Sequence, residues 1–206
     1  MRLWVPLADE LGHGYLGRLC SGNMLNQAQL ARGFGVCIDA MNKSQTRRAL
    51  LDRVLSELQM DRAAWVRQHS LVPASMLLGR WRGGQLGLSR FGHEQHVARS
   101  FVTASVARMC RDCVAGDRER IGFSYWRRTH QLRGVTWCIK HHRPLSQVVD
   151  HCAFETSPHA LCADAADLPE REVRPALECE VLRKYSAVLR RFLTEASSPA
   201  ELSWGG

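Results

Sequence analysis

The sequence contains no apolar run near the roughly 18 to 20 residues that a membrane-spanning helix requires, which predicts no transmembrane segment. Its start also lacks the apolar segment of a secretory signal peptide, because Asp9 and Glu10 lie where that segment would have to be. We therefore expect a cytoplasmic, reducing compartment and no membrane partner. In such a compartment the eight cysteines are not expected to form a disulfide framework, and clustered cysteines bind metal or carry out redox chemistry.

Acidic residues are fewer than basic ones. The chain has 20 Asp+Glu against 28 Lys+Arg, a net charge of +8 at pH 7. Residues 163–206 hold eight of the acids and six of the bases, so residues 1–162 keep 22 bases and 12 acids, a net charge of +10. The excess of positive charge therefore lies in residues 1–162. It favours an anionic partner, and nucleic acid is the leading candidate.

The length of 206 residues corresponds to one large domain or two small ones. The clearest patterns are helical, so we predict a mainly α fold in three parts. These are a helical, helix-turn-helix-like N-terminal subdomain over 1–92, a zinc-finger or zinc-ribbon module over 93–162, and a C-terminal helical segment over 163–206. The glycine- and arginine-rich stretch Gly79–Gly92 is the predicted hinge between the first two parts.

Capping residues predict where the first helices begin. Asp9 is the predicted cap of the first helix, in which Gly12 and Gly14 each cost about 1 kcal/mol relative to alanine. Tertiary packing therefore has to stabilise this helix. Asn26 and Gln29 have the spacing of a capping box and predict a short helix directly after Asn26.

Two further N-terminal helices and one C-terminal helix follow from the same signals. Ser44 and Asp61 are the predicted caps of the next two helices. The helix after Ser44 has one apolar stripe, formed by Leu50, Leu51, Val54, Leu55 and Leu58. A single helix over 176–196 has the strongest amphipathic pattern, and we expect its apolar face to pack on the core rather than bind a partner. Its apolar positions are Leu177, Val181, Leu182, Tyr185, Val188, Leu189, Phe192 and Leu193.

Two pairs of metal-ligating residues share one spacing. Cys110 and Cys113 have two residues between them, as have Cys138 and His141, and 24 residues separate the pairs. In each pair a tight knuckle turn can aim both side chains at one ion, and two such turns complete a zinc tetrahedron. His142 is the alternative to His141, which keeps the two-residue gap.

Four protein ligands leave no position for water or substrate, so the predicted cofactor is one structural Zn²⁺ whose binding energy contributes to folding. The alternatives for the same cysteines are ordinary core thiols and a redox pair.

The residues between the two pairs combine aromatic rings with arginines, which is typical of surfaces that stack bases or clamp phosphates. The candidate nucleic-acid or partner contacts are Tyr125, Trp126, Arg127, Arg128, Arg47 and Arg48. The alternative interpretation packs the two aromatic rings under the metal site and leaves the arginines facing solvent.

The order of these motifs and the gaps between them resemble the pattern of a known protein family. Val106–Cys113, Tyr125–Leu132 and Gly134–Leu145 resemble the zinc-finger signature of the TniQ/TnsD family of transposon target-selection proteins. Pro6–Leu11 and Tyr15–Leu19 resemble the amino-terminal motif of the same family. The chain departs from the family pattern where Arg111 and Ile139 replace a proline that usually follows the first cysteine of each pair.

Many members of that family carry a second finger. Its remnant here consists of His151, Cys152, His159 and Cys162. These residues have irregular gaps, which leaves open whether they hold a second metal ion or form a loop with ordinary thiols.

The resemblance implies a non-catalytic adaptor in the bacterial cytoplasm. Such an adaptor recognises a target site, or is delivered to it, and recruits the AAA+ ATPase regulator and transposase of the transposon. Its implied partners are that ATPase, target DNA and, in the branch associated with CRISPR systems, an effector complex with its guide RNA. The sequence leaves open whether DNA is read directly or through a guide RNA, and it does not fix the target sequence or the oligomeric state.

Two other functions compete with this one. The alternative binding function is a stand-alone helix-turn-helix and zinc-ribbon regulator of transcription, although no clear recognition helix is present. The enzymatic alternative is a nuclease of the His-Asn-His type, which also carries paired cysteine knuckles. Its central asparagine is missing, because Asn23, Asn26 and Asn42 all precede Cys110. We therefore expect no catalytic residues.

Overall fold

The computed structural model describes residues 1–74, 106–132, 134–150 and 152–195. Four helices lie wholly within the first of these ranges. They are α1 (Gly12–Gly22), α2 (Gln27–Gly33), α3 (Lys43–Glu57) and α4 (Arg62–His69). The predicted hinge Gly79–Gly92 and the predicted domain boundary at residue 92 lie outside the described residues.

The second part of the chain contains short strands as well as helices. Its elements are β1 (Ala107–Met109), α7 (Arg111–Ile121), η1 (Arg128–Gln131), β2 (Trp137–Cys138), β3 (Arg143–Pro144), β4 (Ser146–Val148), η2 (Ala153–Glu155), η3 (Pro158–Leu161), β5 (Ala166–Asp167), α8 (Glu170–Glu178) and α9 (Glu180–Glu195). Strands β1, β4 and β5 form an antiparallel sheet in the order β1-β4-β5, and β2 pairs with β3 in a hairpin. Because each strand has only two or three residues, the predicted mainly α class is confirmed.

The helix caps are partly as predicted. Asn26 and Gln29 form the expected capping box at the start of α2. The predicted cap Ser44 is wrong, because the cap of α3 is Asn42, two residues earlier. The Asn42 side chain accepts a hydrogen bond from the Gln45 amide, and the Gln45 side chain accepts one from the Asn42 amide. This pair satisfies two helix-end donors at once.

The predicted cap Asp9 is also wrong. Helix α1 begins after Leu11, with no side-chain cap. The Asp9 backbone has a positive φ of 63°, and its carboxylate accepts hydrogen bonds from the Thr129 hydroxyl at 2.6 Å and the Thr129 amide at 3.2 Å. Asp9 therefore joins the N-terminal segment to η1 instead of opening a helix.

The glycines of α1 allow close packing, as the sequence required. A Cβ atom on Gly14 would lie 2.8 Å from the Trp126 ring, and a Cβ on Gly17 would overlap the backbone of Phe154 and Glu155. The conformational cost of glycine in a helix is thus offset by a contact that no larger residue would permit.

The predicted single C-terminal helix is wrong, because extended backbone at Cys179 divides it into α8 and α9. Helix α8 buries Val173 and Ala176, and α9 buries Leu189. At 100° per residue, an unbroken helix would place Ala176 and Leu189 about 220° apart, on nearly opposite faces. The break turns both toward the core. Several predicted apolar positions are exposed instead, namely Leu177, Val181, Leu182 and Val188.

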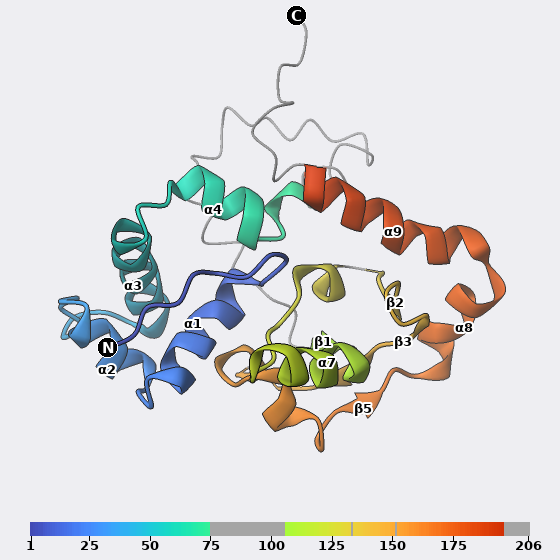
Figure 1. Cartoon of the computed structure of the whole chain (residues 1–206), viewed down its shortest axis with the longest axis horizontal. Coiled ribbons are helices and arrows are strands. Elements are labelled where there is room, and N and C mark those ends of the chain that lie inside the picture. The colour runs from blue at the N-terminus through green and yellow to red at the C-terminus, as the bar shows by residue number, and fades with distance from the viewer. Residues whose placement is uncertain (75–105, 133, 151, 196–206) are drawn as a thin grey trace, which may run out of the picture.

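The buried side chains connect the two parts of the chain. One cluster joins α1 to α4, a second surrounds the metal-ligating cysteines, and a third places Leu11 of the N-terminal segment against Trp126 and Phe154. Figure 1 shows α4 and α9 on the same side of the molecule, with the C-terminal end of α9 close to the end of α4. No helix within the described ranges has both the length and the apolar composition of a membrane span.

Candidate metal centre

Four side chains from two segments of the chain, the β1–α7 junction and the β2–β3 hairpin, converge on one point. Cys110 directly follows β1 and occupies the cap position of α7, and Cys113 lies in the first turn of that helix. Cys138 lies in β2, and His141 lies in the turn that leads to β3. One ligand atom from each residue lies within 4.8 Å of the other three.

The distances within this cluster fit a tetrahedral metal ion. The Sγ atoms of Cys113 and Cys138 are 3.8 Å apart, and His141 Nδ1 lies 3.3, 3.4 and 3.8 Å from the sulfurs of Cys110, Cys113 and Cys138. A zinc tetrahedron with bonds of about 2.3 Å to sulfur and 2.0 Å to nitrogen requires about 3.8 Å between sulfurs and about 3.5 Å between sulfur and nitrogen. The Cys₃His cluster can therefore hold a metal ion.

The local structure at the first pair differs from the prediction of two knuckle turns. The chain passes from strand to helix at Cys110, and the three-residue helical spacing places Cys113 on the same side of α7. The N-terminal end of a helix also favours negative charge, which suits thiolate ligands. The second pair does lie in a tight hairpin turn, in which His142 is exposed with a positive φ of 50° and only His141 joins the cluster.

Hydrogen bonding within the cluster favours a thiolate at Cys138. Hydrogen bonds from the thiols of Cys110 and Cys113 and from the His130 ring lower the pKa of Cys138. The hydrogen bonds to the other two sulfurs, together with burial, raise the pKa of Cys113. The thiolate is the form that ligates metal.

Sequence reasoning missed the roles of four residues: His130 and Arg111, which contact or adjoin the cluster ligands, and the Glu10–Arg18 pair in the N-terminal part of the chain. His130, inside the aromatic and basic stretch, forms a hydrogen bond with the ligand Cys138. Hydrogen bonds of this kind commonly orient the ligands of metal sites. Arg111, which directly follows the ligand Cys110, donates to the carbonyl oxygens of Cys162 and Ala165 at 3.0 and 2.5 Å. Glu10 is buried and bound by Arg18 through two hydrogen bonds of 2.7 and 2.8 Å. The N-terminal motif noted in the sequence, Pro6–Leu11 and Tyr15–Leu19, contains Glu10 and Arg18 and was the signal that could have drawn attention to them.

The C-terminal helices cover the metal centre. Leu168 and Val173 belong, with Leu189 and Leu193 of α9, to the same buried cluster as the three cysteine ligands. The centre thus forms part of the hydrophobic core, and its ligands help to hold α9 in place.

The described residues of the second-finger remnant, Cys152, His159 and Cys162, do not form a second cluster of ligands. Cys152 Sγ lies 3.8 Å from Lys43 Nζ, His159 Nδ1 bonds to the hydroxyls of Ser124 and Ser157, and Cys162 contacts Met109. Within the described part of the chain, only the Cys₃His group brings three or more such ligands together. His151 lies outside that part.

Three of the six predicted contact residues, Tyr125, Trp126 and Arg128, lie in the interior. Trp126 is 1% exposed, packs against Phe154 and donates from Nε1 to the Thr156 carbonyl oxygen at 2.8 Å. The expectation that the aromatic rings are buried is therefore correct. The expectation that both arginines face solvent is wrong for Arg128, which is 3% exposed. In this conformation neither Trp126 nor Arg128 is available to a partner.

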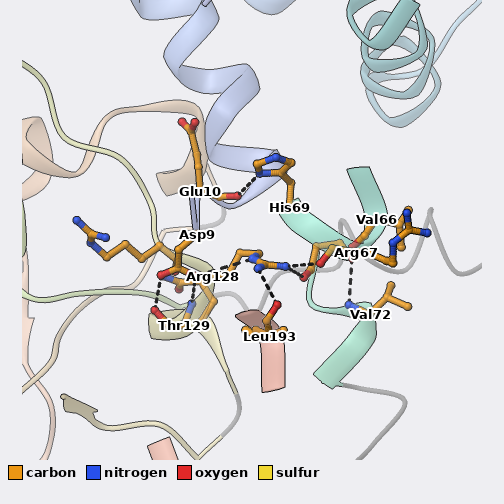
Figure 2. A network of polar contacts seen from close by, with 12 residues as sticks. Asp9, Glu10, Val66, Arg67, His69, Val72, Arg128, Thr129 and Leu193 are labelled. Atoms are coloured by element: carbon orange, nitrogen blue, oxygen red, sulfur yellow. Dashed lines mark hydrogen bonds and ion pairs between the residues drawn. The ribbon is translucent and has the colours of Figure 1, made fainter. Parts of the chain in front are cut away.

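Figure 2 shows the polar contacts that Arg128 makes with other parts of the chain. Its guanidinium donates to the carbonyl oxygens of Arg67 at 2.6 Å and Ser70 at 3.3 Å, and it lies 3.8 Å from the Asp9 carboxylate. Carbonyls at a helix end lack partners within the helix, and a cation there is favourable. Arg128 therefore has a structural role at the end of α4.

The other three predicted contact residues, Arg127, Arg47 and Arg48, are half-buried. Arg127 lies over the Tyr125 ring and pairs with Asp117 at 2.7 Å. Arg47 pairs with Glu155 at 3.0 Å, and Arg48 is half-buried on α3. Contact of these residues with nucleic acid or a partner stays a prediction.

The fold and the site together define a mainly helical protein with a Cys₃His cluster that fits a metal ion. The model of the TniQ family matches residues 2–145, which include all four cluster residues and the N-terminal motif. The chain therefore belongs to the TniQ family, and this membership supports a general role in the selection of transposition targets. No curated protein and no solved structure matches the chain.

Proposed function

We propose that the chain is a non-catalytic adaptor that links a target-site complex to the AAA+ ATPase and transposase of a transposon. The observation that carries this proposal is the family match over residues 2–145, which spans the N-terminal helices and the Cys₃His cluster in one unit. An adaptor of this kind acts through binding free energy, by holding one assembly against another.

The proposed ion is one Zn²⁺ per chain, held by Cys110, Cys113, Cys138 and His141. The donor set of three thiolates and one imidazole supports zinc, and four protein ligands suit a structural site. When bound, zinc would supply folding energy to the module around it. The protein ligands join β1 and α7 to the β2–β3 hairpin, so the ion would fix the platform on which α9 packs.

Nucleic acid is the proposed second partner, bound through phosphates. The net charge of +10 over residues 1–162 supports contacts that do not depend on base sequence. We expect binding of the isolated chain to DNA to be weak and to fall steeply between low and physiological salt. A tight, sequence-specific complex at physiological salt would instead favour a transcription regulator.

The experiment that tests the adaptor is co-sedimentation of the purified chain with its cognate ATPase. We expect binding to ATPase assembled on DNA with nucleotide, and little binding to the free subunit, because a recruiter has to favour the assembled state in order to shift that equilibrium. DNA alone is the control for indirect capture. Failure to sediment with the assembled ATPase, with and without a guide complex, would contradict the proposal.

A further inference from the structure

A pocket of about 330 Å³ opens where α1 ends, and none of its lining residues belongs to the metal cluster. Its apolar wall includes Leu16, Cys20, Met24 and Leu25, and its charged residues are Arg47 and Glu155. Ligand pockets span about 300 to 1,000 Å³, so this volume is at the low end of that range. Such a pocket suits one or two side chains better than a whole cofactor.

Met24 lies at this pocket in an unusual state. Its side chain is 92% exposed, and its backbone has a φ of 57°, a left-handed conformation that residues other than glycine rarely adopt. Helix α1 ends there with the Met24 amide bonded to the Ser21 carbonyl oxygen at 3.1 Å and the Leu25 amide bonded to that of Cys20 at 3.0 Å.

This arrangement is a common helix ending, in which glycine usually occupies the left-handed position. The end of α2 follows that rule with Gly35, which has a φ of 74° and the same pair of hydrogen bonds. At the end of α1 the chain instead places a flexible apolar thioether in solvent, beside an apolar pocket. Exposed methionines of this kind are typical of surfaces that bind varied apolar side chains of other proteins.

The charges at the pocket favour an acidic occupant. Arg47 and Lys43 both contact the single carboxylate of Glu155, at 3.0 and 2.7 Å, which leaves one positive charge in excess. Burial, with the nearby cations Arg47 and Lys43, lowers the pKa of His13 to about 3, so the imidazole stays neutral near pH 7. Lys43 is 60% exposed and so accessible to a partner.

We propose that this pocket docks an acidic segment of a protein partner. One apolar side chain of the segment enters between Leu16, Cys20 and Leu25, where Met24 covers it, and a neighbouring carboxylate lies beside Arg47 and Lys43. The inference goes beyond the adaptor role, because it does not depend on which assembly supplies the segment.

Selection from a phage-displayed library of random nine-residue peptides on the full-length chain tests this proposal. We expect enriched peptides to combine Leu, Met or Phe with Asp or Glu at a neighbouring position. Titration of the best peptide against variants then locates the site. Met24→Gly is expected to weaken binding about tenfold, since a buried thioether contact is lost. Lys43→Glu is expected to weaken binding about fivefold, since it reverses a charge beside the carboxylate.

The end of α3 offers a matched control. Gln59 occupies the same left-handed position, with a φ of 52° and the same hydrogen-bond pattern from Gln59 and Met60. Gln59→Gly is expected to leave peptide affinity unchanged. Since glycine relieves the backbone strain at both positions, neither variant is expected to lower the thermal unfolding temperature.

Weaker binding by Met24→Gly at unchanged thermal stability therefore assigns the effect to the lost side chain. No enriched peptide, enrichment of basic peptides, or equal effects of the two glycine variants would each overturn the proposal.

Discussion

Nη2 of Arg128 lies 3.5 Å from the carbonyl oxygen of Leu193, so a residue of η1 contacts the last turn of α9. The same guanidinium donates hydrogen bonds to the carbonyl oxygens of Arg67 and Ser70 at the C-terminal end of α4 (Figure 2). One buried cation therefore joins the N-terminal helices, the region around the metal centre and the C-terminal helix. Leu193 lies outside the part of the chain that matches the family, whereas Arg128 lies within it.

The first prediction follows from this contact. Arg128→Ala is expected to lower the free energy of unfolding by about 3 kcal/mol, because it leaves buried carbonyl groups without a donor and removes the cation that lies beside the Asp9 carboxylate. Urea denaturation measures this change. Arg128→Lys is expected to lose less, since the charge stays but one ammonium group cannot reach all of the carbonyls.

Arg120 provides the control for this prediction. It is 69% exposed and lies 3.6 Å from Asp117, so Arg120→Ala is expected to change the free energy of unfolding by no more than about 0.5 kcal/mol. Equal losses for Arg120→Ala and Arg128→Ala would show that the buried contacts do not stabilise the fold.

Local signals predicted the local parts of the fold. The Asn26–Gln29 capping box and the Asp61 cap depend on residues three positions apart, and both lie where the sequence indicates. The Asp9 cap failed because the partner of that carboxylate is Thr129, 120 residues further along the chain. The prediction of an unbroken helix over 176–196 failed for the same reason, since the position of the core decides which face each helix buries.

The candidate site, like the fold, could be predicted from the sequence only in part. The spacing of Cys110, Cys113, Cys138 and His141 identified the four cluster residues, because ligand geometry limits the possible gaps. The pattern of aromatic rings and arginines did not reveal that Arg128 is buried. Composition records the kind of side chain, and only the folded chain shows which backbone carbonyls it reaches.

The second prediction compares two helical glycines. Gly17→Ala is expected to destabilise the fold by about 2 kcal/mol, because the added Cβ meets the backbone of Phe154 and Glu155, which cannot move aside easily. Gly116→Ala in α7 is expected to stabilise the fold by up to about 1 kcal/mol, since nothing lies within 4 Å of its added Cβ. Urea denaturation of both variants gives the two signs. A gain for Gly17→Ala would contradict the packing described for α1.

The third prediction concerns pH. Burial lowers the pKa of His69 to about 4, so the ring stays neutral in the folded chain while it is protonated near pH 6.5 in the unfolded chain. The unfolded state therefore binds more protons, and stability present above pH 6.5 is lost as the pH falls toward 4.

Each such histidine contributes at most about 1.4 kcal/mol per pH unit in this window. His69→Asn, whose amide can replace the contact of Nδ1 with the Glu10 carbonyl oxygen, is expected to give a shallower dependence between pH 7 and 5. Denaturation curves of both proteins across this range measure the difference. Identical slopes would show that the pKa of His69 is the same in the folded and the unfolded chain.

The last prediction links the metal centre to α9. We expect elemental analysis to find one zinc per chain, and Cys138→Ser to lose it, whereas Cys37→Ser, at an exposed cysteine outside the cluster, keeps it. Because Leu189 and Leu193 pack in the same buried cluster as the ligands, removal of the metal by a chelator is expected to speed amide hydrogen exchange in α9 as well as in α7. Helices α2 and α3, whose core is separate, are expected to exchange at unchanged rates. Purified protein without metal, or α9 exchange that is insensitive to the chelator, would contradict this coupling.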